Sequence, residues 1–151
     1  MVVFSVIKYT LAFIFNEDLS KVVLIRKNKP DWQKGYLNGI GGKVEHNENS
    51  WECIIREIYE ESNLKFDQKD LKFSGEINSF SSWSVDVFSI KTTDEYLNST
   101  LKTKTNEIVG IYDIEHLDNL NLLPSVKYLI PMVLGLYEDN NFMGFNVKYN
   151  V

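Results

Sequence analysis

Residues 48–61 read Glu48-Asn49-Ser50-Trp51-Glu52-Cys53-Ile54-Ile55-Arg56-Glu57-Ile58-Tyr59-Glu60-Glu61, and the pair Gly41-Gly42 precedes them. On a helix of about 3.6 residues per turn, Glu57, Glu60 and Glu61 project from one face within a single turn. Carboxylates placed in this way repel one another, so a nearby cation would stabilise the helix. Mg²⁺ or Mn²⁺ suits the position, because these hard ions take carboxylate oxygens and keep coordination positions for water and phosphate.

A simpler interpretation is a solvated acidic face on which Arg56 pairs with Glu60 across one turn. The spacing around the run favours more than that. It consists of Gly42, five residues, Glu48, seven residues, Arg56-Glu57, the aliphatic Ile58, one residue, Glu60-Glu61, one residue, Asn63 and the aliphatic Leu64. This spacing resembles the Nudix box, the signature of the MutT-like pyrophosphohydrolases.

Both ends of the expected helix are marked in the sequence. Asn49 followed by Glu52 is typical of a capping box, which predicts a helix over Ser50–Ser62. Asn63 stands where the family normally has glycine, at a C-terminal cap that commonly needs a left-handed backbone, and asparagine tolerates that conformation. The buried stripe is expected to contain Trp51, Ile54, Ile55 and Ile58, opposite the acidic face. We interpret Cys53 as a packing residue.

Composition limits the class of protein. The 151 residues, 44% of them hydrophobic, fit one domain spanning residues 1–151. The single cysteine excludes an intramolecular disulfide framework and favours a reducing, cytoplasmic location. The apolar first fifteen residues, interrupted by Lys8, favour a buried strand over a signal peptide or membrane span. The net charge of −5 argues against binding of long nucleic acid, but not against a nucleotide substrate. Monomer and homodimer both stay open.

The order of expected elements predicts an α/β fold. Strands are expected at Val2–Phe15, Lys21–Arg26, Leu37–Val44, Leu71–Ile77, Val85–Ile90, Glu107–Asp113 and, at the end, Phe142–Tyr149. Helices are expected at Ser50–Ser62 and Val126–Tyr137, a hairpin turn at Asn16-Glu17-Asp18 and a mobile loop at Thr92–Asn106. The resemblance implies the Nudix fold over nearly the whole chain: a mixed β-sheet sandwiched between helices, with the loop-helix motif.

The resemblance also implies roles for the motif residues. Glu60 and Glu61 are expected to be the principal Mg²⁺ ligands, with Mn²⁺ as a substitute. Glu57 is expected to be a ligand or the base that activates water, with Arg56 holding its carboxylate by a charge-assisted fork. Gly41 is expected to lend a backbone carbonyl to the metal, since glycine permits close approach.

Three further charged residues have expected roles near the motif. Glu48 matches the box glutamate that forms a supporting ion pair near Arg56. Family members often take another acidic ligand from outside the box, and Glu107 is the candidate here, ahead of Glu95 and Asp94, although a solvated glutamate at the start of a strand is the alternative. Lys43 either contacts a substrate phosphate or pairs with a neighbouring carboxylate.

The group attached to the phosphates is harder to identify. Tyr36-Leu-Asn38-Gly-Ile-Gly41-Gly-Lys-Val-Glu45 is similar to a segment of the oxidised-purine nucleoside triphosphatases in which the asparagine binds the base. Asn38 is therefore a candidate for purine recognition or a local turn residue, and Trp32 and Tyr36 for stacking or core packing. Ser125 and Val126 stand where those enzymes carry base-reading aspartates, which favours broad triphosphate hydrolysis over strict selection of an oxidised purine such as 8-oxo-dGTP.

Three hypotheses follow. The first is a Mg²⁺-dependent enzyme that cleaves a nucleoside triphosphate to monophosphate and pyrophosphate. The second is hydrolysis of ADP-ribose or a nucleotide sugar, ranked lower because such enzymes often carry an extra N-terminal dimerisation segment that this chain lacks before its first strand. The third is a Nudix-fold module that binds nucleotide or protein without catalysis, against which the retained Arg56, Glu57, Glu60 and Glu61 argue.

Overall fold

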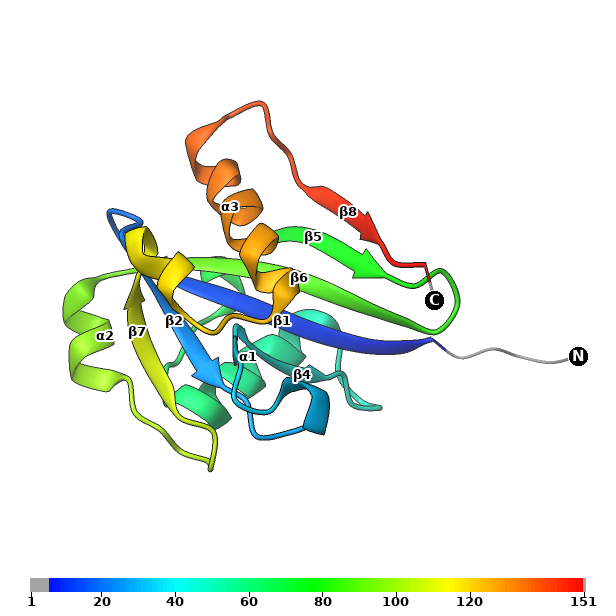
Figure 1. Ribbon diagram of the computed structural model, residues 1–151, viewed down its shortest axis with the longest axis horizontal. Coiled ribbons are helices and arrows are strands. Elements are labelled where there is room, and N and C mark those ends of the chain that lie inside the picture. Colours follow the sequence, from blue (N-terminus) through cyan, green and yellow to red (C-terminus); the bar gives the residue numbers. More distant parts are fainter. Residues whose placement is uncertain (1–5, 151) are drawn as a thin grey trace, which may run out of the picture.

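The computed structural model describes residues 6–150, which form one mixed β-sheet with helices on both faces (Figure 1). The strands are β1 (Ile7–Asn16), β2 (Lys21–Arg26), β3 (Leu37–Asn38), β4 (Ile40–Lys43), β5 (Lys72–Asn78), β6 (Trp83–Thr92), β7 (Val109–Asp113) and β8 (Phe145–Lys148). The helices are α1 (Ser50–Ser62), α2 (Asp94–Thr100) and α3 (Pro124–Glu138), with short 3₁₀ helices η1 (Asp31–Gln33), η2 (Gln68–Asp70) and η3 (Ile114–Asn119).

Strand β1 lies at the centre of the sheet. The strand order is β3-β2-β1-β6-β5-β8, with β4 paired to β1 and β7 paired to β2. One edge of β1 runs parallel to β6 over its whole length. The other edge is shared by β4, in register Leu11↔Gly41, and β2, in register Ile14↔Val23, both antiparallel. The glycine-rich segment before α1 is thereby fixed against the central strand.

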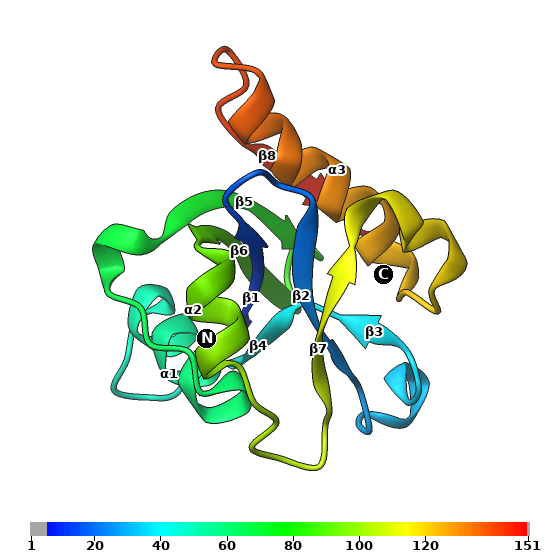
Figure 2. The same ribbon diagram turned by 90° about the vertical axis from the view of Figure 1, so that its left-hand side faces the viewer.

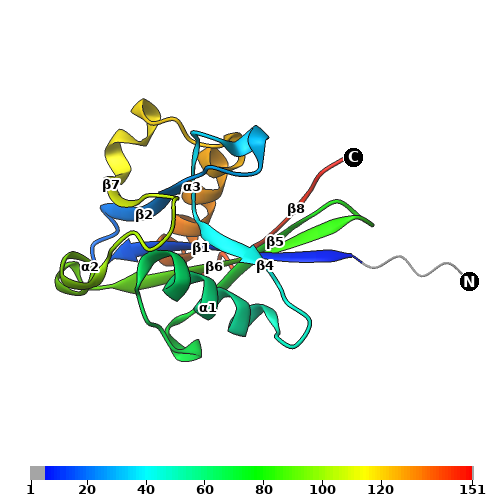
Figure 3. The same ribbon diagram turned by 90° about the horizontal axis from the view of Figure 1, so that it is seen from below.

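The two faces of the sheet bury two separate cores. Because side chains alternate along a strand, Leu11, Phe13 and Phe15 of β1 face α3, whereas Ala12 and Ile14 face α1. The core on the α1 face also contains Leu97 of α2, Ile54 and Ile58. Figure 3 shows α1 on one side of the sheet and α3 on the other. The expected α/β sandwich is confirmed, and the α1 face is the one that carries the acidic helix.

The segment 92–106 differs from the prediction, since it contains helix α2 and is not an irregular loop. The Thr93 side chain accepts a hydrogen bond from the Tyr96 backbone N–H and so caps the helix. Leu97 is buried in the core. A single buried leucine in a Thr- and Asn-rich segment is too weak a pattern to show from sequence, and tertiary packing decides this helix.

The strand expected at Leu37–Val44 is also wrong in part, because the structure divides it into β3 and β4. Asn38 ends the pairing with β2, and after Gly39 the chain continues against β1. A Cβ on Gly39 would lie 2.6 Å from the Ala12 carbonyl oxygen, so only glycine fits this crossing.

Other boundaries shift by a few residues. The first strand begins at Ile7, and the expected positions 2–5 lie outside the described residues. Helix α3 begins at Pro124, which suits the first turn because that position needs no N–H donor, and the last strand is shortened to Phe145–Lys148. The hairpin turn after Asn16 is confirmed.

Candidate active site

Helix α1 has the predicted bounds and both predicted caps. The Asn49 side chain accepts from the Glu52 N–H at 2.9 Å, and the Glu52 carboxylate accepts from the Asn49 N–H at 3.1 Å. Asn63 ends the helix with φ 67°, in the left-handed region, and its Nδ2 donates to the Thr100 carbonyl. Asn63 thus adopts the expected left-handed cap conformation and adds a hydrogen bond from its side chain.

Arg56 lies at the centre of a carboxylate cluster on this helix. Its Nε and Nη2 donate to Glu48 at 3.0 and 2.6 Å, and its Nη1 donates to Glu57 at 3.0 Å and to Glu60 at 3.1 Å. The fork expected between Arg56 and Glu57 is wrong, because Glu48 receives the two-point contact and Glu57 a single bond. The ion pair near Arg56 that was expected of Glu48 is present. The pairing with Glu60 across one turn is present as well.

This arrangement shifts the pKa values of its members. Hydrogen bonds from Arg56 lower the pKa of Glu48 to about 2, and those to Glu48 raise the pKa of Arg56 above its ordinary value. Glu48 is therefore ionised at any physiological pH. Its fixed charge anchors the guanidinium, which in turn orients Glu57 and Glu60.

Glu61 does not lie on the solvated face with Glu60. Its side chain is turned into the protein, with 9% of the residue exposed, and Oε2 is buried without a hydrogen-bond partner among the described residues. Burial raises the pKa of Glu61 to about 9, and the neighbouring Glu57 adds to the shift through a shared proton and its charge. A buried carboxylate oxygen with no donor fits a cation, because a cation would supply the missing partner.

The glycine pair before α1 is required by close packing. A Cβ on Gly41 would lie 1.9 Å from the Thr10 carbonyl oxygen, and a Cβ on Gly42 would lie 2.3 Å from Oε1 of Glu57. The carboxylate of Glu57 therefore rests directly against the backbone of β4. This brings the backbone of the glycine pair and a motif glutamate into contact, while the expected role of the Gly41 carbonyl as a metal ligand stays a prediction.

Glu107 lies near this helix but has partners of its own. Its Oε1 accepts from Nζ of Lys27 at 3.1 Å, and its Oε2 accepts from the backbone N–H groups of Asn28 at 2.6 Å and Lys29 at 3.4 Å. The sequence did not identify Lys27 as a partner of Glu107. The one feature that could have indicated it is the position of this lysine at the end of an apolar strand. The alternative that Glu107 is a solvated residue is wrong, because only 7% of it is exposed. Its role as a metal ligand stays a prediction.

The acidic side chains, as they stand, do not enclose an ion: among residues 6–150, no three Asp, Glu, His or Cys side chains come close enough together to hold a metal. Arg56 holds Glu57 and Glu60 in its own hydrogen bonds, and Glu61 points inward. The residue types nevertheless fit Mg²⁺, since hard oxygen donors and one unpartnered buried oxygen stand on adjacent turns of α1.

The candidate substrate residues are distributed along the segment before the motif. The side-chain oxygen of Asn38 accepts from the Gly39 N–H at 2.8 Å, which is the local turn role. Trp32 is 69% exposed on η1, whereas Tyr36 packs against the core. Lys43 is exposed. Among the described residues, no carboxylate lies within 4.0 Å of Lys43 Nζ.

The segment that ends at the start of α3 lies beside Leu37, the residue before Asn38. The Leu123 N–H donates to the Leu37 carbonyl at 3.0 Å, and Leu37 pairs with Leu122 in a parallel bridge. Val126 is fully buried at the start of α3. The apolar side chain of Val126 cannot form the hydrogen bonds of an aspartate. The base-reading contact of the oxidised-purine enzymes is therefore absent at this position.

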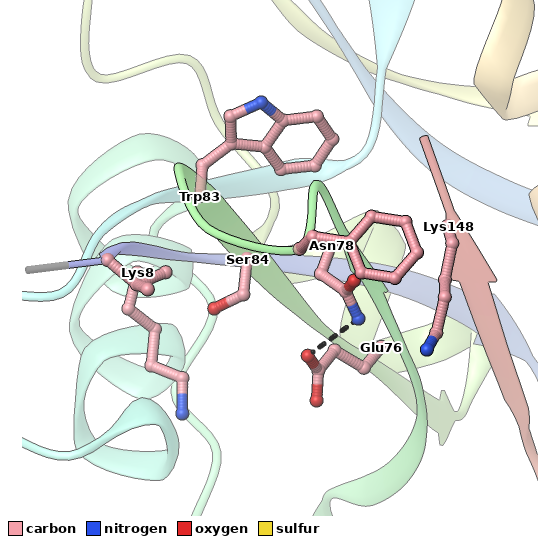
Figure 4. A pocket seen from close by; sticks show the side chains of 8 residues that line it. Lys8, Glu76, Asn78, Trp83, Ser84 and Lys148 are labelled. Carbon is pink, nitrogen blue, oxygen red and sulfur yellow. Dashed lines mark hydrogen bonds between the residues drawn. The ribbon is translucent and has the colours of Figure 1, made fainter. Parts of the chain in front are cut away.

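A cavity of about 510 Å³, lined by polar and apolar side chains, lies at the end of the sheet formed by the start of β6 and by β8 (Figure 4). It is lined by Val6, Lys8, Glu76, Asn78, Phe80, Trp83, Ser84 and Lys148. In Figure 4, Lys8, Ser84 and Glu76 point to one side of the sheet and Trp83 to the other. No candidate site residue lines this cavity, but Lys8 lies 3.4 Å from Asp86, which accepts a 2.5 Å hydrogen bond from Ser50 at the start of α1. This link ties the acidic helix to the sheet.

No helix within residues 6–150 combines the length and the apolar character needed to cross a membrane.

Comparison with known proteins identifies the fold. A MutT from work on Aliivibrio salmonicida and Vibrio cholerae has a TM-score of 0.71 at 22% identity, over 87% of this chain and 99% of that one. The Nudix domain of Shewanella oneidensis NrtR, solved with ADP ribose, has a TM-score of 0.72 at 11% identity, over 88% and 89%. A Nudix hydrolase from Nitrosomonas europaea has a TM-score of 0.72 at 14% identity, over 100% and 83%.

These identities establish a shared fold and no more. Among curated protein sequences, none matches this chain. The family model described as "NUDIX domain" matches residues 8–132, which include all of β1 except Ile7, the glycine pair, α1 and Glu107. The chain therefore belongs to the Nudix family.

Proposed function

We propose that this protein is a Mg²⁺-dependent pyrophosphohydrolase that cleaves a nucleoside triphosphate to a nucleoside monophosphate and pyrophosphate. The observation that carries the proposal is the acidic face of α1, where Arg56 holds Glu57 and Glu60 and where Glu61 keeps a buried, unpartnered oxygen. Glu57, Glu60, Glu61 and the Gly41 carbonyl would hold the metal, with Mn²⁺ as a substitute. When bound, the ion would neutralise phosphate charge and lower the pKa of a coordinated water.

The chain's own residues have separable tasks in this reaction. Glu57 rests on Gly42 and is fixed by Arg56, so its carboxylate is positioned to accept a proton from water. Water then adds to phosphorus, the anhydride P–O bond breaks, and pyrophosphate leaves with the bonding electron pair. Lys43, exposed beside the motif, would contact a phosphate.

Base recognition is assigned to Asn38 and Trp32. The exposed indole of Trp32 offers a stacking surface, and the Nδ2 of Asn38 makes no hydrogen bond to the described residues. The buried Val126 supplies no polar contact, which supports broad base acceptance, with an oxidised purine such as 8-oxo-dGTP as one substrate among several.

The first test is a turnover assay with a panel of nucleotides, in Mg²⁺ and in chelator, measuring pyrophosphate and phosphate. Release of pyrophosphate from triphosphates, abolished by chelator, is the expected result. Glu57→Gln and Glu60→Gln are expected to lower kcat by about 100-fold or more, because each removes a charge that acts on the reacting water or metal. The exposed Glu17→Gln in the turn between β1 and β2 is the matched control and should retain full activity. Full activity in Glu57→Gln or Glu60→Gln would refute the assigned roles.

A second candidate function is hydrolysis of ADP-ribose or a nucleotide sugar. It is favoured by one observation: the similar Nudix domain of NrtR binds ADP ribose, while this chain lacks polar base readers at Val126. Monophosphates from ADP-ribose, with no pyrophosphate from triphosphates, would establish it. The non-catalytic module would instead bind a nonhydrolysable analogue in calorimetry and turn over nothing in the panel.

A further inference from the structure

A row of polar side chains crosses four strands at the end of the sheet where β1 begins. Strand pairing places Lys8 of β1 beside Ser84 of β6. It also places Asn78 of β5 between Ser84 and Lys148 of β8. Figure 2 shows β1, β6 and β5 one after another, with α1 on one side of them and α3 on the other. Because neighbouring strands lie about 4.8 Å apart, two lysines stand at the ends of a row about 14 Å wide, with a hydroxyl and an amide between them.

This row lies on the α1 face of the sheet, beyond the end of the helix. Ala12 and Phe88, further along the same face, are buried in the core under α1. The helix begins at Ser50, whose hydroxyl donates to Asp86, the next residue of β6 on this face after Ser84. The row is therefore left without a covering helix, and it lines the cavity of about 510 Å³ (Figure 4).

Ser84 is the buried member of the row, and its hydroxyl is free. Only 7% of the residue is exposed, and within residues 6–150 its Oγ has no hydrogen-bond partner. A buried hydroxyl is normally hydrogen-bonded. Because this one belongs to the wall of a cavity, it is available to a ligand that enters there.

The two carboxylates near the row already have donors from the protein. Glu76 lines the cavity and accepts from the Asn78 amide at 3.0 Å. Asp86 accepts from the Ser50 hydroxyl and pairs with Lys8 at 3.4 Å. An ammonium group has three donors and no acceptor, so Lys8 keeps donors in excess of this one contact. The hydrogen-bonding capacity that stays free in the cavity is therefore mainly that of donors.

Lys148 and Phe80 lie together at the opposite side of the cavity. Nζ of Lys148 lies 4.9 Å from the centre of the Phe80 ring. In the part of the chain that the structure describes, no carboxylate lies within 4.0 Å of this ammonium. Phe80 is 75% exposed, so its ring offers a stacking surface. An unpaired ammonium beside an exposed ring suits a ligand that joins a phosphate to a planar ring.

We propose that this cavity is a second ligand site, separate from the acidic face of α1, and that it binds a nucleoside monophosphate. The phosphate accepts from Ser84 and from the ammonium groups of Lys8 and Lys148, and the base stacks on Phe80. The volume of about 510 Å³ lies within the range of about 300 to 1,000 Å³ that is typical of small-molecule sites. Binding here needs neither Mg²⁺ nor turnover, so the proposal is independent of the proposed reaction.

The test is an NMR titration of the whole protein in the presence of a chelator. Adenosine monophosphate, inorganic phosphate and adenosine are added separately, so that the contributions of the phosphate and of the ring are measured apart. Lys148→Gln and Ser84→Ala each remove donors from the cavity. Lys91→Gln is the matched control, because it removes one exposed charge at the other end of β6. Lys148 is exposed, so its replacement should leave the fold intact.

The expected result is a saturable shift of the Ser84 and Lys148 amide resonances with adenosine monophosphate. Inorganic phosphate should shift the same resonances with weaker affinity, and adenosine should leave them unchanged. Lys148→Gln and Ser84→Ala should each raise the Kd of adenosine monophosphate by about fivefold or more, whereas Lys91→Gln should change it by less than about twofold.

Four results would overturn the proposal. They are the absence of a saturable shift, shifts confined to α1, equal weakening in all three variants, and binding of adenosine as tight as that of its monophosphate. Binding of inorganic phosphate as tight as that of adenosine monophosphate would overturn the stacking role of Phe80. No turnover is measured, so a protein that hydrolyses no nucleotide would defeat the proposed function and leave this test valid.

Discussion

Replacing Glu61 by glutamine should stabilise the metal-free protein and should abolish the added stability that Mg²⁺ gives to the parent protein. The carboxyl of Glu61 is buried beside Glu57, and its pKa is raised from an ordinary 4.5 to about 9. Without a cation the folded protein therefore holds this proton up to about pH 9, whereas the unfolded chain releases it above about pH 4.5. The free energy of unfolding is therefore highest below about pH 4.5, the pKa in the unfolded chain, and falls as the pH rises from there to about pH 9.

The magnitude follows from the same shift. While only the folded protein holds the proton, each pH unit above 4.5 lowers the free energy of unfolding by about 1.4 kcal/mol. The buried carboxyl of Glu61 therefore lowers it by at most about 4 kcal/mol at pH 7.5. Local relaxation and entry of water reduce such costs, and we expect Glu61→Gln to gain about 1 to 3 kcal/mol at pH 7.5, or about 3 to 10 °C in Tm. Glutamine fills the same space, stays neutral and can donate to Glu57 as the protonated acid does.

Thermal unfolding in chelator from pH 5 to 8.5 measures this effect. The difference in Tm between Glu61→Gln and the parent should be near zero at pH 5 and grow with pH. Glu60→Gln is the matched control, because 53% of that side chain is exposed and its replacement should leave no such trend. In Mg²⁺ the parent should gain stability and Glu61→Gln should not. A variant that is less stable than the parent at pH 7.5, or a difference that does not change with pH, would refute the reasoning.

Three further substitutions test the surroundings of the site. Gly42→Ala should displace the Glu57 carboxylate, since a Cβ there would lie 2.3 Å from Oε1, and we expect kcat to fall at least tenfold while the protein still folds, as circular dichroism would show; unchanged kcat would contradict the contact. Glu48→Gln should cost about 1 to 3 kcal/mol at pH 7 and much less near pH 2, because the pKa of Glu48 is lowered to about 2 and its stabilisation is lost as the pH falls toward that value; urea unfolding at both pH values checks the trend, and an equal cost at both would exclude the pair with Arg56 as its cause. Asn63→Ala should cost about 2 kcal/mol in the same assay, from the left-handed φ of 67° and the lost bond to Thr100, while a loss under about 0.5 kcal/mol would show that the cap conformation carries no strain.

The motif helix could be predicted from sequence because its signals are local. Asn49 and Glu52 fix its start within one turn, Asn63 can take the left-handed conformation that ends it, and the positions of Arg56, Glu57 and Glu60 on one surface follow from helix geometry alone. The family assignment rests on the same residues and their spacing from Gly42, and the match of the family model confirms it.

The partners of the charged side chains could not be predicted in this way. Three glutamates on one face look equivalent in sequence, yet Glu61 is buried and Glu60 is exposed, because the sheet covers only one side of the helix. Helix α2 is missed for a related reason, since its one buried side chain, Leu97, becomes stabilising only against a core built by other segments.

The sequence by itself determined the class of fold, the acidic helix with its caps, and the family. Only the tertiary structure decided that Arg56 gives its two-point contact to Glu48, that Lys27 pairs with Glu107 from 80 residues away, and that one oxygen of Glu61 lacks a partner. The physical reason is that backbone geometry is set over a few neighbouring residues, whereas burial and charge pairing depend on which distant segments the sheet brings together.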